Sequence, residues 1–382
     1  MKDNNLNVVY IGPPSFPLGW ASTKRRRYMV DYMNDHEISC HVLVTGLFRN
    51  KQNPIQGKYR NTDYYDLSSF LVRKNVFGYL KKGINLLAQW YVPNKKNILI
   101  FHTLLYWNEW LFYKFAKRKG YVIVFDQVET SYLQNKTGSF AFRCITRLSE
   151  LISDKAYQSC PAFVISSALM MENTQKYPKR KLCLLQNSTP IADVPLKQYV
   201  NKPIVLLYSG TYTPKDGVSF LIDGVIQAHN NVDCKLVLLG KGNKQDMKVL
   251  NKIVGKDYIE YKGFVSDETL NSIMLQSDIL CMTRTNSRFA NYGFPFKLSE
   301  YLATGNILLA TDVGDVAKYV QDKKSALIVQ PESATAISNA IKYVDVNRDE
   351  SINIANNGYN VAKEHFSIEH VGNIFVSFLK EL

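Results

Sequence analysis

Short apolar runs recur along the chain and alternate with longer segments of mixed polarity. Three such runs in the first half are Leu6–Ile11, Asn97–Thr103 and Tyr121–Asp126, and the pattern starts again near residue 204. Runs of this kind are typical of strands covered on both faces, whereas the segments between them have helical periodicity. The alternation predicts parallel sheets with helices on both sides.

The length of the chain and a cluster of prolines indicate two domains. At 382 residues, the chain exceeds the usual size of a single hydrophobic core. Pro190, Pro195 and Pro203 follow the last strand expected in the first half, and a new series begins with the residues IVLLYSG. We therefore place the first domain at residues 1–195, the second at 196–365, and a final apolar-periodic helix at 366–382.

Positive charge is concentrated in the first half. Residues 1–200 contain 28 lysines and arginines against 13 aspartates and glutamates, whereas residues 201–382 contain 19 against 20. This asymmetry predicts an acidic partner for the first half, such as an anionic membrane surface, a phosphorylated acceptor or nucleic acid. Because the basic residues form no recognition helix or RNA-binding motif, we expect no nucleic-acid partner.

The expected location is the cytoplasm, with peripheral attachment to the inner face of the membrane as an open alternative. The sequence has no apolar run of about 18 residues and no apolar signal-peptide region. Its six cysteines are scattered, which fits neither a zinc site nor a disulfide framework. The run from Ser68 to Val92 intersperses lysine and arginine with apolar residues. This pattern fits an amphipathic helix on an anionic bilayer or one packed on the core.

The stretch from Asn291 to Asp315, NYGFPFKLSEYLATGNILLATDVGD, is the most informative part of the sequence. Gly293 and Pro295 indicate a loop, Lys297–Ala303 has helical composition, and a short buried strand follows. Glu300 is the only carboxylate of the loop and helix, and we expect it near the helix start, beside backbone N–H groups that could hold an anion. On pattern alone, an ordinary αβ unit is equally compatible.

The same stretch resembles the donor-binding signature of retaining family-4 glycosyltransferases, which have the GT-B fold. It is most similar to the variant pattern FPxKxxEYxAxG. The resemblance implies that Tyr292, Gly293, Phe294, Lys297 and Glu300 bind a nucleotide-sugar donor. Tyr292 stands where the family usually carries a first glutamate, and a proline replaces the second glycine of the turn.

Other segments of the second half resemble the same family. YSGTYTPKDGVSFLIDGV is similar to a turn in which an arginine and a lysine bind the donor phosphates. Gly210 matches, but Thr211 replaces the arginine and Asp216 the lysine, with Lys215 one place earlier. Further donor contacts implied by the resemblance are Gly240, Gly242, Phe264, Arg284 and Arg288.

Candidate residues of the first half lie in loops after predicted strands. The resemblance implies a loop glycine against the donor diphosphate and acceptor, and Gly19 holds that position, although a plain strand-to-helix turn is the alternative. Asp126, Glu129 and His102 fall at strand ends, where open α/β sheets bind ligands. They are the candidate catalytic residues, although a lone histidine at a strand end is more often structural.

The predicted fold is therefore GT-B, with two Rossmann-like domains facing across a cleft and the last helix crossing back to the first domain. The predicted reaction moves a hexosyl or related group from a nucleotide diphosphate sugar, of UDP or GDP type, to an acceptor hydroxyl with retention. We expect a glycan or lipid-linked acceptor in surface polysaccharide or glycolipid assembly, and neither a metal nor a cofactor. The substituted phosphate clamp leaves a catalytically inactive GT-B scaffold or partner subunit as the alternative.

Overall fold

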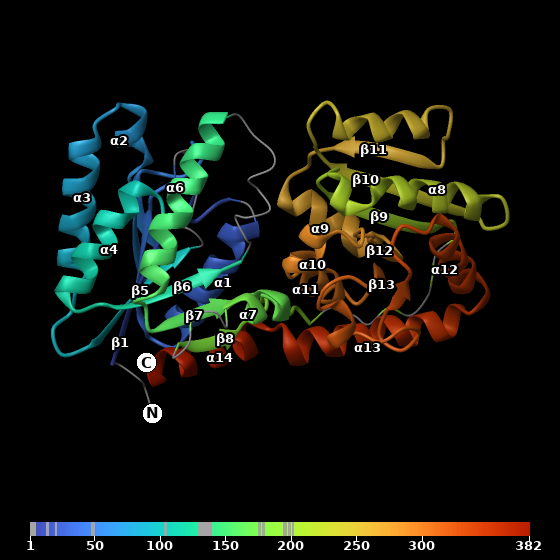
Figure 1. Cartoon of the computed structure of the whole chain (residues 1–382). Helices are drawn as coiled ribbons and strands as arrows, with labels where there is room; N and C mark the ends of the chain where they lie inside the picture. The colour runs from blue at the N-terminus through green and yellow to red at the C-terminus, as the bar shows by residue number, and fades with distance from the viewer. Residues whose placement is uncertain are drawn as a thin grey trace. The chain divides into compact units, whose positions relative to one another are not determined.

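The computed structural model describes residues 5–12, 15–19, 21–46, 50–102, 105–128, 140–174, 177, 180–193, 197, 200 and 202–382. The chain divides into two compact units (Figure 1), and each is described by itself. The first comprises Met1–Ser188 with Ile368–Leu382, and the second comprises Thr189–Ser367. The sequence-based boundaries lie at residues 195 and 365, close to these limits.

The first unit is built on an eight-stranded sheet in the order β3-β4-β2-β1-β5-β6-β7-β8. Its strands are β1 (Leu6–Ile11), β2 (Ser39–Val44), β3 (Gln56–Tyr59), β4 (Thr62–Asp66), β5 (Lys96–His102), β6 (Val122–Gln127), β7 (Ala162–Ile165) and β8 (Lys181–Leu184). All pairings are parallel except that of β3 with β4. Every residue of β1 is buried, as expected for a central strand covered on both faces.

Two groups of helices cover this sheet (Figure 1). The helices are α1 (Ala21–Asp35), α2 (Ser68–Val72), α3 (Val76–Gln89), α4 (Trp107–Lys119), α6 (Phe140–Tyr157), α7 (Ala168–Thr174) and α14 (Ile368–Glu381). Helix α4 contacts α3, α6 and β6, whereas α1 contacts β2 and α14. The apolar periodicity of α14 buries Val371, Phe375 and Leu379. This packing places the last helix in the first unit and confirms its predicted return.

The second unit has a six-stranded parallel sheet in the order β11-β10-β9-β12-β13-β14. Its strands are β9 (Ile204–Gly210), β10 (Cys234–Gly240), β11 (Ile259–Gly263), β12 (Ile279–Met282), β13 (Ile307–Thr311) and β14 (Leu327–Val329). The helices are α8 (Val218–His229), α9 (Asp267–Gln276), α10 (Arg288–Tyr292), α11 (Phe296–Leu302), α12 (Ala334–Val346) and α13 (Arg348–His365), with short 3₁₀ turns that include η1 (Pro214–Asp216). The order is that of a Rossmann sheet.

The basic amphipathic run of the first half forms two helices rather than one. Helix α2 ends at Val72, and α3 begins after Asn75, whose side chain accepts the Gly78 N–H as an N-cap. One face of α3 packs on the core through Tyr79 and Leu87, but Phe77 near its start is 77% exposed. The run therefore combines a core-packed helix with an exposed apolar and basic turn.

None of the helices in the described ranges is both long and apolar enough to cross a membrane.

Candidate functional site

The strand order of the second unit reverses between β9 and β12, and ligands of open α/β sheets bind at the carboxyl ends of strands beside such a point. Gly210 ends β9, and Thr283 and Arg284 follow β12. The 3₁₀ turn η1 lies next to them, because the Thr285 N–H donates to the carbonyl of Lys215 at 2.9 Å. The segments that resemble the donor signature thus meet at one edge of the sheet.

Lys297 on α11 places its ammonium beside Gly210. Its Nζ lies 4.2 Å from the centre of the Tyr208 ring, and a Cβ added to Gly210 would lie 2.3 Å from the same Nζ. Tyr208 is fully buried and donates its hydroxyl to the carbonyl of Thr211. Glycine at position 210 therefore makes the room that the lysine occupies.

Burial lowers the pKa of Lys297 to about 8. Asp216 and Glu300 act against this shift, whereas Arg284 and Lys215 add to it. Three cationic side chains and two carboxylates are thus within electrostatic range of one another. Such a group of cations at the carboxyl edge of the sheet is suited to a polyanionic ligand.

Lys215 and Arg284 are held by their surroundings. The Lys215 ammonium lies 4.4 Å from the centre of the Phe289 ring. Arg284 donates from Nη1 to the carbonyl of Gly293 at 2.9 Å, and its own carbonyl accepts the Thr311 hydroxyl at 2.7 Å. Arg284 thereby fixes the loop between α10 and α11, where the donor signature begins.

The two residues that depart from the family's phosphate clamp bind each other. The hydroxyls of Thr211 and Thr213 both donate to Oδ2 of Asp216, each at 2.6 Å. Asp216 is buried, and Gly217 after it adopts a positive φ of 66°. Where the resembling family carries two cations, this chain therefore has a hydrogen-bonded loop closure around a carboxylate. Of the predicted phosphate ligands near this loop, Lys215 and Lys297 carry the positive charge.

Gly240 and Gly242 are explained by packing within the unit. A Cβ on Gly240 would lie 1.9 Å from the carbonyl oxygen of Gly210, and its φ of 111° also favours glycine. A Cβ on Gly242 would lie 3.1 Å from Cβ of Asp246. At Gly293, in contrast, φ is −103° and nothing lies within 4 Å of an added Cβ. Of these glycines, Gly293 is the one that borders open space.

Glu300 is the fifth residue of α11, so the expectation that it lies at the helix start is corrected. The helix begins at Phe296, one residue earlier than the composition of the sequence indicates. Glu300 instead follows Lys297 by one turn, and residues three apart share a face of a helix. The carboxylate and the ammonium are therefore neighbours on the same face and interact electrostatically.

The predicted aromatic contacts differ in exposure. Phe264 is 72% exposed after β11, with the Lys241 ammonium 5.1 Å from its ring centre. Tyr292 is buried and has the Arg288 guanidinium carbon 5.5 Å from its ring centre. The Phe294 ring is buried against Tyr319 and Phe366. The side chain of Phe294 is thus part of the core, which leaves its backbone for a ligand.

In the first unit, Asp126 and His102 lie opposite each other in the register of β5 and β6. Asp126 accepts from Nη2 and Nε of Arg25 at 3.2 and 3.4 Å. Burial alone would raise the pKa of Asp126, but the Arg25 guanidinium outweighs it and holds that pKa well below its ordinary value. Nδ1 of His102 is 3.9 Å from Asp126, too far for a hydrogen bond. Burial lowers the pKa of His102.

The predicted roles of Gly19 and Glu129 in the site remain predictions. A Cβ on Gly19 would lie 2.1 Å from Oγ of Ser15 and 2.4 Å from Oγ1 of Thr23, so packing inside its own loop accounts for glycine there. Glu129 lies outside the described residues. The first unit thus brings together His102 and Asp126.

Sequence reasoning missed Arg25 and Glu109. Arg25 makes five hydrogen bonds, to Asp126, Asn187 and two backbone carbonyls. Glu109 is buried near the start of α4, where it accepts from the Thr45 hydroxyl at 2.5 Å and the Tyr106 N–H at 3.1 Å. Burial raises its pKa to about 7. The partners of Arg25 lie at least 101 residues away in the sequence, so no local pattern marks it. Glu109 stands at a capping-box position after Tyr106, which is a local signal, but its contact with Thr45 spans 64 residues.

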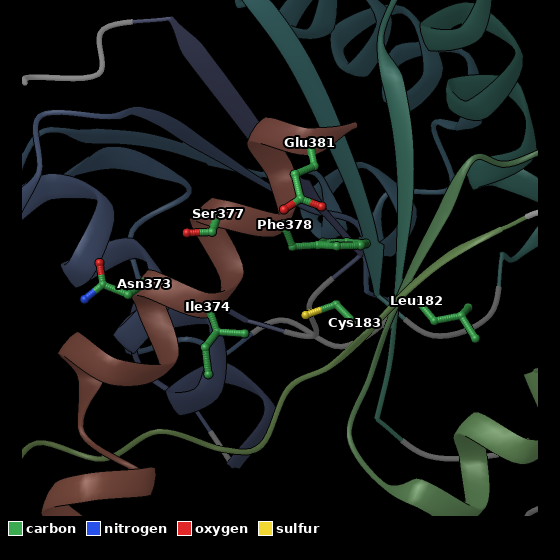
Figure 2. Close-up of a pocket in the computed structure, with 7 residues that line it drawn as sticks. All are labelled: Leu182, Cys183, Asn373, Ile374, Ser377, Phe378 and Glu381. Carbon is green, nitrogen blue, oxygen red and sulfur yellow. The ribbon is translucent and has the colours of Figure 1, made fainter.

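A separate pocket lies between the edge strand β8 and α14 (Figure 2). It is lined by Leu182, Cys183, Asn373, Ile374, Ser377, Phe378 and Glu381. The lining includes none of the predicted site residues and no lysine or arginine. It is therefore poorly suited to a diphosphate. In the described ranges, no group of three or more His, Cys, Asp or Glu side chains could hold a metal ion.

Comparison with known proteins relates the second unit to a glycosyltransferase family. Residues 203–344 match the family model of glycosyl transferases group 1. The match covers the sheet, η1 and the donor-like stretch of the second unit. No curated protein matches the chain significantly.

Solved structures resemble the whole chain. A sucrose-phosphate synthase from Thermosynechococcus elongatus has a TM-score of 0.73 at 14% identity and covers 98% of each chain. HepE of Anabaena, in complex with UDP, has a TM-score of 0.69 at 13% identity, over 98% of this chain and 100% of its own. A mutant of TarM from S. aureus, in complex with UDP and α-GlcNAc-glycerol, scores 0.70 at 10% identity, over 98% and 99%. Together with the two parallel sheets, these likenesses confirm the predicted GT-B fold class of two Rossmann-like domains.

Proposed function

We propose that the protein is a glycosyltransferase that moves a hexosyl or related group from a UDP- or GDP-type sugar to an acceptor hydroxyl, with retention. The observation that carries the proposal is the cationic cluster of Lys297, Arg284 and Lys215 at the reversal of strand order in the second sheet. It falls within the segment that matches glycosyl transferases group 1. A sugar nucleotide carries its negative charge on the diphosphate, which this cluster complements.

The residue roles follow from what group transfer requires. The diphosphate leaving group gains negative charge as the sugar is transferred, and the Lys297 and Lys215 ammonium groups would stabilise that charge. Glu300, on the same face of α11 as Lys297, would accept hydrogen bonds from the ribose hydroxyls. The exposed Phe264 ring would stack on the base, and the open space at Gly293 would admit the sugar or phosphate.

Binding of nucleotides is the direct test of this donor site. Thermal unfolding is measured with UDP, GDP, ADP, CDP and their common sugar conjugates, for the wild type and Glu300→Ala. A ligand at 100 times its dissociation constant adds about 2.7 kcal/mol to the free energy of unfolding. Glu364→Ala is the matched control, because that carboxylate is 75% exposed at the end of α13. One nucleotide should stabilise the wild type and the control more than Glu300→Ala. Product anomers followed by NMR then decide between retention and inversion.

The acceptor side of the proposal places the protein at the inner face of the cytoplasmic membrane, in surface polysaccharide or glycolipid assembly. The turn between α2 and α3 supports it, because Val72 and Phe77 are exposed there beside Arg73 and Lys74. An apolar and cationic surface of this kind suits an anionic bilayer. Phe77→Ser should weaken sedimentation with anionic vesicles. Equal sedimentation of the variant and the wild type would refute this surface.

A catalytically inactive GT-B scaffold is the second candidate. The observation that favours it is the closure of Asp216 by Thr211 and Thr213, which occupies two positions that carry phosphate-binding cations in the resembling family. A scaffold of this kind would show no stabilisation by any of the nucleotides. Transfer of sugar from a donor that binds would exclude it.

A further inference from the structure

Among the residues that the structure describes, the buried charges at the carboxyl edge of the first sheet do not balance. Arg25 and Arg26 are both buried on α1, and among the described residues Asp126 is the one carboxylate that acts on the charge of Arg26. That carboxylate is already bound by Arg25 through Nε and Nη2. The neighbouring His102 is kept neutral by its lowered pKa. One positive charge is therefore left over.

The unbalanced charge belongs to Arg26. This residue is 3% exposed, and its Nε and Nη1 are buried without a hydrogen-bond partner among the described residues. Arg26 lies with its guanidinium carbon 5.5 Å from the centre of the Tyr10 ring. A ring face attracts the cation but does not accept hydrogen bonds in the plane of the guanidinium. Burial lowers the pKa of Arg26 only to about 10, so the group stays charged at neutral pH.

Buried N–H donors on a charged group are normally satisfied, and the exceptions need an explanation. Nδ1 of His102 is likewise buried without a hydrogen-bond partner among the described residues, and it lies 3.9 Å from Oδ2 of Asp126. His102 ends β5, and Tyr10 is the penultimate residue of β1, so the unpartnered nitrogens lie at the end of the sheet where ligands bind. Planar N–H donors of arginine match the oxygens of phosphate groups, and a low-dielectric site strengthens that attraction.

We propose that Arg26 and His102 bind a phosphate group of the acceptor at the carboxyl edge of the first sheet. Calling the ligand an acceptor rests on the proposed transferase function, whereas the binding of an anion at this site does not. It gives the acceptor a chemical class, a phosphorylated molecule, and assigns different tasks to two adjacent arginines. Arg25 holds the architecture through its five hydrogen bonds, whereas Arg26 supplies the charge for the ligand.

The adjacent arginines provide a matched pair of variants. In phosphate-free buffer, Arg26→Met should unfold at the same temperature as the wild type or higher, because it removes a buried charge without a partner. Arg25→Met should unfold at a clearly lower temperature, because it leaves Asp126 and three further oxygen acceptors without the hydrogen bonds that Arg25 donates. A lower unfolding temperature for Arg26→Met in the same buffer would show that Arg26 is structural and would overturn the proposal.

Binding is then measured with inorganic phosphate and with glycerol 1-phosphate, at constant ionic strength against sodium chloride. Both should raise the unfolding temperature of the wild type in a saturable way and leave Arg26→Met unchanged. Equal responses of the two proteins, or a response to inorganic phosphate alone, would overturn the assignment to a phosphorylated acceptor.

Both titrations are repeated in a Lys297→Met background, so that phosphate bound in the second unit does not contribute. UDP binding to Arg26→Met is measured separately. If UDP stabilises this variant as it does the wild type while the phosphate response is lost, both proposals stand. If no nucleotide binds but the phosphate response depends on Arg26, the transferase function fails and the anion site remains.

Discussion

Replacement of Lys297 by methionine separates the effect of the ammonium on the stability of the fold from its contribution to UDP binding. The methionine keeps the apolar stem beside Tyr208 and removes the ammonium. If that ammonium binds the donor diphosphate, its loss removes a hydrogen bond to a charged group, about 1.5–3 kcal/mol. UDP should therefore bind roughly 10- to 150-fold more weakly. Isothermal titration calorimetry measures this directly, with Lys324→Met, an exposed lysine of the same unit, as the control.

The same variant should not be less stable than the wild type at pH 7. In the folded protein Lys297 loses its proton near pH 8, whereas the unfolded lysine keeps it to 10.5. The unfolded state thus binds more protons between these values, so the lysine opposes folding below pH 8 and this penalty is relieved as the pH rises to 10.5. The penalty is at most about 3 kcal/mol and smaller in practice, because Lys297 retains some contact with solvent.

The pH dependence of UDP binding tests whether the charge of Lys297 contributes to the affinity. Above pH 8 the free lysine deprotonates, so UDP affinity should fall by up to about tenfold per pH unit. In Lys297→Arg the charge persists, and affinity should stay level over the same range. UDP affinity of Lys297→Met within twofold of the wild type would refute the reasoning, because the ammonium would then have no part in binding.

Three further predictions use other features of the structure. Gly240→Ala should lower the unfolding temperature by many degrees, because its Cβ would meet the Gly210 carbonyl at 1.9 Å. Gly210→Ala should lower it less, through backbone strain, and should weaken UDP binding because its Cβ displaces the flexible Lys297 ammonium. Circular dichroism melts and calorimetry separate the two, and equal melting would contradict the first. Gly293→Ala should leave the melt unchanged but weaken UDP binding, since its Cβ enters open space; unchanged affinity would remove the ligand from that space. Because the pKa of Glu109 is raised, the folded state binds more protons than the unfolded state between pH 4.5 and about 7. The free energy of unfolding should therefore fall as the pH rises across that window. Glu109→Gln should flatten this fall in melts recorded from pH 5 to 8.

Alternation of apolar runs with helical segments was enough to predict two parallel α/β units, because burial on both faces leaves a sequence pattern in every central strand. The strands from Leu6 and from Ile204, and the return of the last helix, followed from that pattern and the family resemblance. The hairpin of β3 and β4 and helix α4 were not predicted. Their segments are rich in tyrosine, lysine and tryptophan, and their periodicity is weak.

The resemblance to family-4 glycosyltransferases identified Lys215, Lys297 and Glu300 as candidate ligands, because these residues lie within contiguous signatures. The tertiary structure decided what surrounds them: it closed Asp216 with two threonines, placed the Lys297 ammonium beside Gly210, and moved Glu300 beyond the first turn of α11. The pairing of Arg25 with Asp126 and the unpartnered donors of Arg26 could not be read from the sequence. Adjacent arginines look identical in a sequence, and only the burial and the partners that the fold provides distinguish a structural charge from an available one.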